Sequence, residues 1–119
     1  MSDNRRCYRL DIALPVALKS TGSKKKALVA VTRDISALGF CILCKDRPSV
    51  GESVVLELGL PNRQKLKIHA QVVWVTEEPY IHDDKEYRAG VKIIDAPKAD
   101  EKKFVKFYAS SLLSFFKKK

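Results

Sequence analysis

The sequence has little of what marks a secreted, membrane-spanning or disulfide-stabilised protein. Its 119 residues include only three cysteines, which cannot all pair within one chain, and secreted proteins rarely leave a free thiol. No apolar run approaches the ~20 residues that cross a bilayer. The start of the chain is polar and lacks the apolar stretch of a signal peptide. We therefore expect a cytoplasmic location.

Residue patterns of catalysis are missing as well. The two histidines, His69 and His82, fall in a predicted strand and in an acidic loop, and neither has a neighbour in sequence that indicates a triad or a metal site. Ser36 is not part of a Gly-x-Ser-x-Gly elbow, and no Gly-rich phosphate loop is present. The sequence therefore predicts no enzyme, no catalytic residues and no cofactor.

The pair Cys41-x-x-Cys44 does not favour a metal or redox site. Zinc takes four ligands, and no second cysteine pair or nearby histidine supplies the others. A redox pair usually begins a helix, which lowers the thiol pKa, whereas this pair falls in a predicted strand. Residues three apart in a strand point to opposite faces. We interpret both cysteines as small buried apolar side chains.

Positive charge is abundant, and it is concentrated at the two ends of the chain. The net charge is +9. Residues 1–33 hold eight Lys or Arg against two acids, and residues 102–119 hold six lysines and no acid. Residues 34–101 hold nine bases against twelve acids. This distribution favours an anionic partner, which is a phosphate ligand, a nucleic acid or an anionic membrane surface.

Alternating apolar residues predict a series of short strands. Between Leu10 and Lys19 every second side chain is large and apolar, as in a half-buried strand, with Pro15 indicating an edge or a bulge. Further strands are expected at 27–32, 40–44, 54–58, 66–74 and 87–93, and the apolar set of 66–74 ends with Trp74. Short connections without helices favour an antiparallel barrel or sandwich. The sequence therefore predicts one all-β domain with a single core.

The pattern changes to that of a helix after Pro97. Asp100 is expected to cap a helix that runs to about Phe116. At 100° per residue, one broad face collects Phe104, Val105, Phe107, Tyr108, Leu112, Phe115 and Phe116. Lysines and serines lie opposite, with Leu113 as the exception. We expect the apolar face to pack on the barrel; contact with a partner or with an anionic membrane is the alternative.

Two short segments combine residues that recognise nucleotides. The first is Arg5-Arg6-Cys7-Tyr8-Arg9, and the second is Asp34-x-Ser36-x-x-Gly39. Arginine binds phosphate and the O6/N7 edge of guanine in a bidentate manner and stacks on planar rings. A carboxylate accepts from the N1–H and N2–H₂ donors of guanine, and a serine hydroxyl adds a small donor. Taken singly, each segment also fits a solvated basic tail or an ordinary turn.

Both segments, in this order, resemble the PilZ domain, the bacterial receptor for cyclic di-GMP. Arg5-Arg6-x-x-Arg9 matches its Arg-rich motif, and Asp34-x-Ser36-x-x-Gly39 matches its (Asp/Asn)-x-Ser-x-x-Gly motif. The resemblance extends through Val50-Gly51 with Val54-x-Leu56-x-Leu58, through Ala70-x-Val72-Val73-Trp74 and through Tyr87-x-x-Gly90-Val91. It implies a stand-alone PilZ protein whose fold is a six-stranded antiparallel β-barrel with a C-terminal α-helix.

The resemblance also implies a cyclic di-GMP site made by Arg5, Arg6, Arg9, Asp34, Ser36 and Gly39. The first and third arginines are expected to grip guanine edges and phosphates, with the second assisting or stacking. The aspartate would bond the Watson–Crick edge of a guanine, the serine would contact the ligand, and the glycine would leave room for it. Some family members bind a dimer of the dinucleotide, and the motifs do not fix the stoichiometry.

These assignments divide the chain into a flexible ligand-binding segment at 1–9, a barrel at 10–96, and a helix with a basic tail at 97–119. We expect the ligand to order the first segment, so that an unidentified downstream protein reads the changed surface. Two alternatives remain open. One is a basic barrel that binds single-stranded nucleic acid, which the acidic middle of the chain disfavours; the other is a ligand-free adaptor acting through the C-terminal helix.

Overall fold

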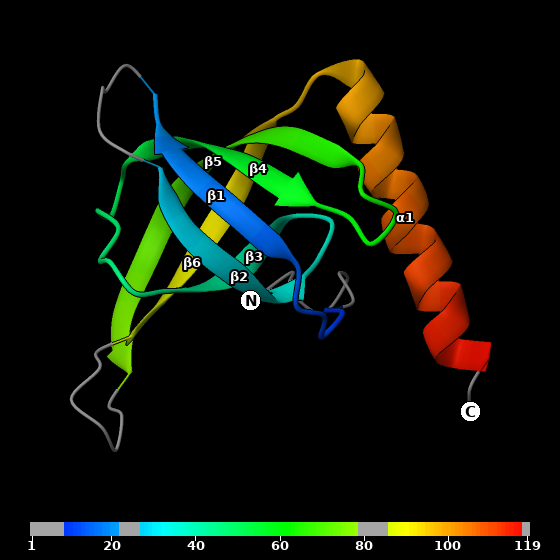
Figure 1. Cartoon of the computed structure of the whole chain (residues 1–119), viewed down its shortest axis with the longest axis horizontal. Helices are drawn as coiled ribbons and strands as arrows, with labels where there is room; N and C mark the ends of the chain where they lie inside the picture. Colours follow the sequence, from blue (N-terminus) through cyan, green and yellow to red (C-terminus); the bar gives the residue numbers. More distant parts are fainter. Residues whose placement is uncertain (1–8, 22–26, 79–85, 118–119) are drawn as a thin grey trace, which may run out of the picture.

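The computed structural model describes residues 9–21, 27–78 and 86–117, and shows a closed antiparallel β-barrel followed by one helix (Figure 1). The six strands are β1 (Pro15–Ser20), β2 (Leu28–Ile35), β3 (Gly39–Cys44), β4 (Ser53–Gly59), β5 (Lys65–Glu78) and β6 (Glu86–Asp95), and the helix is α1 (Lys98–Lys117). The all-β class, the number of strands and the C-terminal helix predicted from the sequence are confirmed.

The order of the strands around the barrel is β1-β2-β3-β6-β5-β4, and β4 closes the barrel by pairing with β1. Short connections join most neighbours, so that β1, β2 and β3 form one meander and β4, β5 and β6 form another. The two meanders meet where β3 pairs with β6 and where β1 pairs with β4. Closure pairs both edges of each of the six described strands, which protects the sheet from pairing with other chains.

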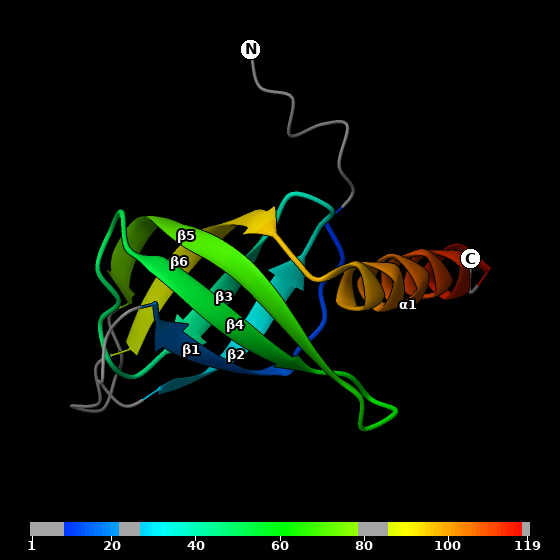
Figure 2. The ribbon, with the colours of Figure 1, turned by 90° about the horizontal axis from the view of Figure 1, so that it is seen from above.

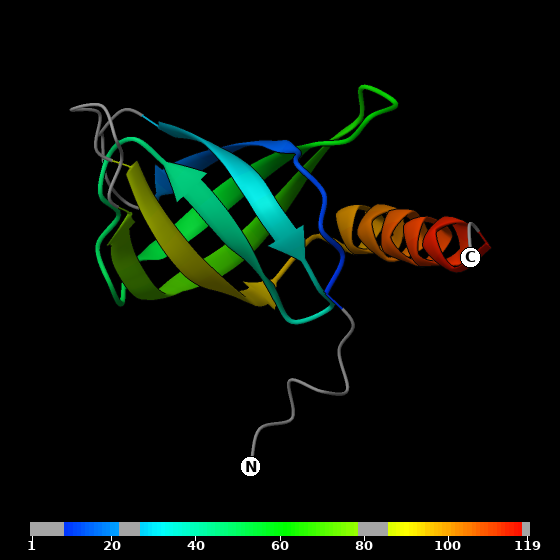
Figure 3. The same cartoon turned by 90° about the horizontal axis from the view of Figure 1, so that it is seen from below.

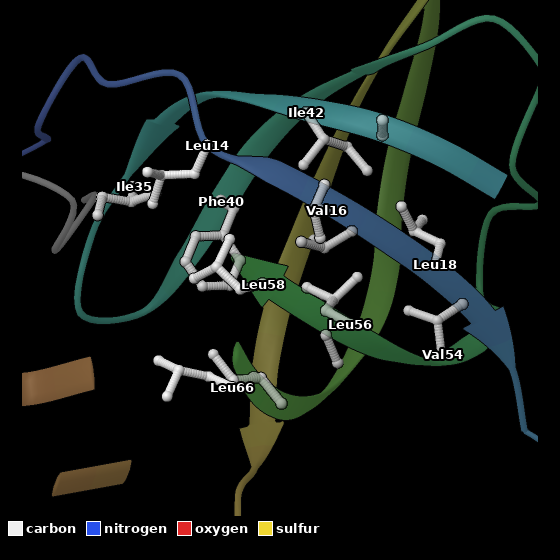
Figure 4. Close-up of a cluster of buried hydrophobic side chains, with 14 of the residues drawn as sticks. Leu14, Val16, Leu18, Ile35, Phe40, Ile42, Val54, Leu56, Leu58 and Leu66 are labelled. Carbon is white, nitrogen blue, oxygen red and sulfur yellow. The ribbon is translucent and has the colours of Figure 1, made fainter. Parts of the chain in front are cut away.

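The core fills the barrel with the apolar residues of the alternating pattern (Figure 4). Ile35, Ile42, Leu56, Leu58 and Leu66 are fully buried. Each comes from a strand whose intervening side chains point to the outside, because successive residues of a strand face opposite sides of the sheet. The period of two in the sequence therefore specifies the inner surface of the barrel directly.

The first strand begins later than predicted, at Pro15 rather than at Leu10. Upstream, Leu10 makes only an isolated bridge to Ile35. The reason is the buried side chain of Thr32, which lies where the strand ladder would continue. Its hydroxyl accepts a hydrogen bond from the Leu14 amide at 2.8 Å and donates to the Ile12 carbonyl at 2.7 Å. A side chain thus replaces the backbone partners that a continuous strand would have used.

The start of α1 also differs from the prediction. The helix begins at Lys98, and the Pro97 carbonyl accepts the first helical hydrogen bond, from the Glu101 amide at 2.8 Å. Asp100 therefore lies within the first turn and is not the cap. Its carboxylate instead accepts from the backbone amide of Lys67 in β5, at 2.7 Å. The acidic residue that was expected to cap the helix attaches the helix to the barrel.

The helix packs on the barrel mainly through Phe104, which is buried. The Phe104 ring meets the Phe40 ring edge-on, at 5.6 Å between centroids, and stacks on Tyr108 at 6.1 Å. Phe107, Tyr108 and Leu112 are half-buried against the same core, as predicted, while the axis of α1 leads away from the barrel (Figures 2 and 3). Val105 is 56% exposed, so its expected place on the packed face is wrong. Leu113 is exposed, and the side chains of 115–117 lie outside the described part of the chain.

Within the described residues, no helix has the length and apolar character that crossing a membrane requires.

The role of Thr32 is testable by the nearly isosteric change Thr32→Val. We expect a loss of about 1–3 kcal/mol in the free energy of unfolding, because the buried Leu14 amide and Ile12 carbonyl both lose their partner. Urea denaturation measures this loss. The matched control is Thr76→Val at an exposed position of β5, which should change stability by less than about 0.5 kcal/mol. Equal losses of stability at the two sites would show that the Thr32 hydroxyl does not stabilise this segment.

Candidate functional site

A row of four residues crosses the outer face of the barrel and forms the base of the candidate site. Asp34 of β2 pairs with Cys41 of β3, Cys41 pairs with Gly90 of β6, and Gly90 pairs with Trp74 of β5. Four strands therefore place these residues side by side, although the chain separates the first from the last by 40 positions. The row exists only in the folded barrel.

Two irregularities in strand pairing turn the ends of this row outward. In β2 the register shifts between Thr32 and Asp34, as at a β-bulge, which adds one residue and reverses the facing of those that follow. Asp34 therefore faces outward although Thr32, two residues earlier, is buried. A second shift in β5 separates Val72 from Trp74. Val72 is fully buried and Trp74 is 42% exposed, so the expectation that Trp74 continues the inward apolar set is wrong.

Gly90 is the residue that makes space for the indole of Trp74. A Cβ atom added at Gly90 would lie 2.2 Å from the indole Nε1 and 2.4 Å from Cε2. The ring therefore lies directly over the glycine backbone. Any side chain at position 90 would displace it.

The turn between β2 and β3 is held by the Ser36 side chain. Its hydroxyl accepts from the amides of Leu38 and Gly39, both at 3.2 Å, and donates to the Gly39 carbonyl at 3.1 Å. The Ser36 amide donates to the same carbonyl at 2.9 Å. Ser36 is 9% exposed. These bonds occupy its hydroxyl within the turn, which is the ordinary structural role that the sequence also allowed.

Gly39 is needed for close packing of two backbones. A Cβ atom at this position would lie 2.1 Å from the carbonyl oxygen of Val91 in β6. Among the described residues, positive φ angles occur only at Arg63 and Gly51, so Gly39 does not serve a left-handed turn. The glycine was expected to leave room for a ligand; the structure shows that it also allows the close approach of β3 to β6.

Asp34 carries a perturbed carboxyl group at the edge of the row. Partial burial raises its pKa above the ordinary 3.8, and Asp11 adds to the rise; Arg9, Arg33 and the backbone N–H of Cys41 oppose it. Because folding raises this pKa, the ionised carboxylate lowers the stability of the fold at neutral pH. That loss disappears as the pH falls through the raised pKa. A carboxylate that lowers the stability of the fold in this way is a candidate for contact with a ligand.

The cysteines lie on opposite faces of β3, as predicted. Cys44 belongs to the core, and Cys41 faces the outer groove yet is only 8% exposed. Burial raises the pKa of both thiols, that of Cys44 to about 11. Thiols with raised pKa values hold their protons at neutral pH and are poor nucleophiles and metal ligands. Their place in the structure is that of small apolar side chains.

The row, the turn and the chain at Arg9 enclose a groove of about 400 Å³. Among its lining residues are Arg9, Asp34, Leu38, Trp74 and Lys92. Four of the six residues proposed from the sequence therefore line one groove: Arg9, Asp34, Ser36 and Gly39. Arg5 and Arg6 lie outside the described residues.

Sequence reasoning missed Trp74 and Lys92 as groove residues. Lys92 pairs with Gly39 across β3 and β6, a relation that the linear order does not show. For Trp74 a signal was present. It is the single tryptophan, and it ends an apolar series opposite a strand that contains Gly90, where an aromatic ring commonly covers a glycine of the neighbouring strand.

The chain belongs to the PilZ family. The family model described as "PilZ domain" matches residues 3–110, which span most of the first segment, the barrel and α1 as far as Ser110. No curated protein matches the chain.

Solved structures with the same fold include the PilZ domain of another protein. The PilZ domain of YcgR from Escherichia coli, solved with c-di-GMP, is 14% identical with a TM-score of 0.74, covering 98% of this chain and 97% of that one. MrkH of K. pneumonia in its apo state is 17% identical with a TM-score of 0.76, covering 100% and 55%. The Bacillus subtilis inhibitor of motility, MotI/DgrA, is 19% identical with a TM-score of 0.73, covering 95% and 53%. The chain thus spans about half the length of the last two proteins.

The contact between Gly90 and Trp74 predicts the effect of Gly90→Ala. The added methyl group displaces the indole, so we expect a loss of about 1–3 kcal/mol in the free energy of unfolding and a changed emission spectrum of the single tryptophan. In a Trp74→Ala background the same substitution meets no ring and should cost much less. A double-mutant cycle measures the difference. Additive effects would show that the clash is not the cause.

Proposed function

We propose that this protein binds cyclic di-GMP in the outer groove and acts as a receptor that passes the signal to a partner protein. The observation that carries the proposal is the lining of the groove, where the Arg9 guanidinium, the Asp34 carboxyl and the half-exposed indole of Trp74 occur together. A cation, a carboxylate and a planar ring are the three groups that an anionic guanine nucleotide requires. Membership of the PilZ family supports the same ligand.

Each group has a distinct part in the proposed complex. Arg9 forms paired hydrogen bonds with a phosphate or with the O6/N7 edge of guanine. Asp34 accepts from the N1–H and N2–H₂ donors of a guanine, which selects guanine over adenine because adenine lacks this pair of donors. Trp74 offers a ring face on which a base stacks, a contact of about 1–3 kcal/mol per base. Lys92 adds positive charge at the rim.

Ser36 and Gly39 support the site indirectly. Since the Ser36 hydroxyl is engaged three times within its own turn, its contribution is to fix the turn that borders the groove. Gly39 allows β3 to approach β6, which brings Asp34 and Cys41 into the same row as Gly90. Both residues therefore belong to the site because they shape it.

The signalling step involves the segment before Arg9. Residues 1–8 include Arg5 and Arg6. In the proposed complex Asp34 and Trp74 contact one side of the ligand, and these two arginines would bind its other side. Closing this segment over the groove orders it and changes the exposed surface, and a partner then binds the new surface. YcgR was solved with c-di-GMP, and MotI is an inhibitor of motility; these precedents support a ligand-controlled adaptor.

Calorimetric titration with cyclic di-GMP tests the binding site. We expect saturable binding by the wild-type protein and a loss of about tenfold or more for Arg9→Ala and for Asp34→Ala, because each removes charge-assisted hydrogen bonds. The matched control is Arg63→Ala, which removes a guanidinium from the exposed turn before β5 and should bind like wild type. Full binding by Arg9→Ala, or equal losses at Arg9 and Arg63, would contradict the proposed site.

The same titration at two salt concentrations separates the nucleotide site from general binding of single-stranded nucleic acid. An electrostatic binder loses most of its affinity between ~50 and ~200 mM salt. A guanine-selective groove loses less and discriminates against cyclic di-AMP. A protein that prefers an oligonucleotide of mixed sequence, with a steep salt dependence, would be the nucleic-acid binder instead.

Ordering of the first segment is tested by amide hydrogen exchange with and without cyclic di-GMP. We expect protection of residues 2–8 only in the complex, because the ligand supplies the contacts that hold Arg5 and Arg6. Arg5→Ala combined with Arg6→Ala should abolish this protection. Equal exchange in both states would leave a receptor without this switch.

A further inference from the structure

A strip of exposed apolar side chains follows α1 on the side next to the end of β6. Ile94 is 57% exposed, Val105 is 56% exposed and Leu113 is 61% exposed. Ile94 and Val105 line one groove of about 300 Å³, whose floor includes Phe104. Ala109, also exposed, and Leu113 follow Val105 by four and eight residues and continue along one side of the helix. We refer to Ile94, Val105, Ala109 and Leu113 as the α1 strip.

Lysines border the α1 strip on the side away from the barrel. Lys102 and Lys106 are exposed, and at 100° per residue they lie about 60° and 100° around the helix from Val105. Phe104, which contacts the barrel, lies on the other side of Val105. Ala109 and Leu113 lie about 40° and 80° from Val105 in the same direction, so the strip begins beside the barrel at Val105 and reaches the lysine side of the helix at Leu113. No acidic residue occurs from position 102 to the end of the chain, and the acidic residues nearest the strip, Asp95 and Glu101, line the groove on the barrel side of Val105.

We propose that the α1 strip binds an amphipathic helix of a partner protein, and that this helix carries acidic residues on the flank that faces Lys102 and Lys106. An apolar strip spaced by four residues accepts the side chains of a second helix between its own, as in other helix-in-groove complexes. The lysine row selects this acidic flank by charge complementarity. This identification of the partner rests on the proposed receptor function. In that function the α1 strip is the surface that binds the downstream protein.

Two other occupants fit the surface less well. A second copy of the chain would meet the strip through a two-fold axis, which places the lysine rows of both copies around the same contact. An anionic membrane would attract the lysines, but Asp95 and Glu101 line the same groove and would face the lipid head groups. In a helix complex these two carboxylates can instead pair with a basic residue at one end of the partner.

Fluorescence anisotropy with two synthetic helical peptides tests the proposal on the full-length protein. Both peptides are about three heptads long with leucine at the a and d positions; one has glutamate and the other lysine at the flanking positions. We expect saturable binding of the glutamate peptide and binding of the lysine peptide at least about tenfold weaker. Val105→Glu and Leu113→Glu should each weaken the glutamate peptide about tenfold or more, as for central contact residues.

Lys106→Glu and Lys103→Glu form a matched pair for the charge argument. Both change the net charge equally, but Lys103 lies about 160° around the helix from Val105. Only Lys106→Glu should weaken the glutamate peptide. All four variants should keep the wild-type affinity for cyclic di-GMP, because the α1 strip contains none of the proposed ligand residues. If only the proposed cyclic di-GMP site is wrong, the protein will not bind the nucleotide but will still prefer the glutamate peptide.

Several outcomes would overturn the proposed partner. Binding of neither peptide, or equal losses for Lys106→Glu and Lys103→Glu, would show that the α1 strip does not recognise an acidic helix. Sedimentation of a dimer that Val105→Glu dissociates would assign the strip to a second copy. Co-sedimentation with vesicles of anionic phospholipid, lost in Leu113→Glu, would assign it to a membrane surface.

Discussion

The pairing of β3 with β6 is the interaction on which the rest of the structure depends. It joins the meander of β1, β2 and β3 to the meander of β4, β5 and β6, and with the β1–β4 contact it closes the barrel. The approach is so close at Gly39 that a single Cβ atom would collide with the Val91 carbonyl. Two strands that are far apart in the chain thereby become neighbours, and the row from Asp34 to Trp74 becomes continuous. The candidate site is a product of barrel closure.

The site is built where the barrel departs from regular pairing. A register shift turns Asp34 out of β2, and another turns Trp74 out of β5. Bulges of this kind re-aim a side chain without interrupting the sheet for more than one residue. The departures reduce stability locally, since Asp34 is held partly buried with a raised pKa and Trp74 leaves almost half of its surface in water. A bound ligand would supply a hydrogen-bond partner to the Asp34 carboxylate and cover the exposed ring of Trp74. Departures from regular strand pairing are expected at functional positions.

The helix divides its residues between the fold and the outside. Phe104 fixes it to the barrel through Phe40, and Asp100 attaches it to the backbone of β5. The remaining apolar residues exceed what this short contact covers, so that Val105 and Leu113 stay exposed. The turn that carries Ser36 connects the two regions, since Leu38 lines the groove of the candidate site and Ala37 lines the groove beside α1. Two surfaces with different chemistry therefore lie on either side of one hydrogen-bonded turn.

The sequence by itself determined the strands, their number and the inner surface of the barrel, because alternation with a period of two is a local property that each strand displays on its own. It also identified Asp34 and Arg9 as candidate ligand residues, because their chemistry is readable without coordinates. The same alternation assigned Trp74 to the wrong face and began the first strand too early. In both places a long-range contact overruled it. A bulge depends on the pairing with another strand, and the Thr32 hydroxyl replaced the backbone partners of a segment about twenty residues away. Only the tertiary structure decided which side chains share a groove, since barrel closure sets distances between residues that the chain holds far apart.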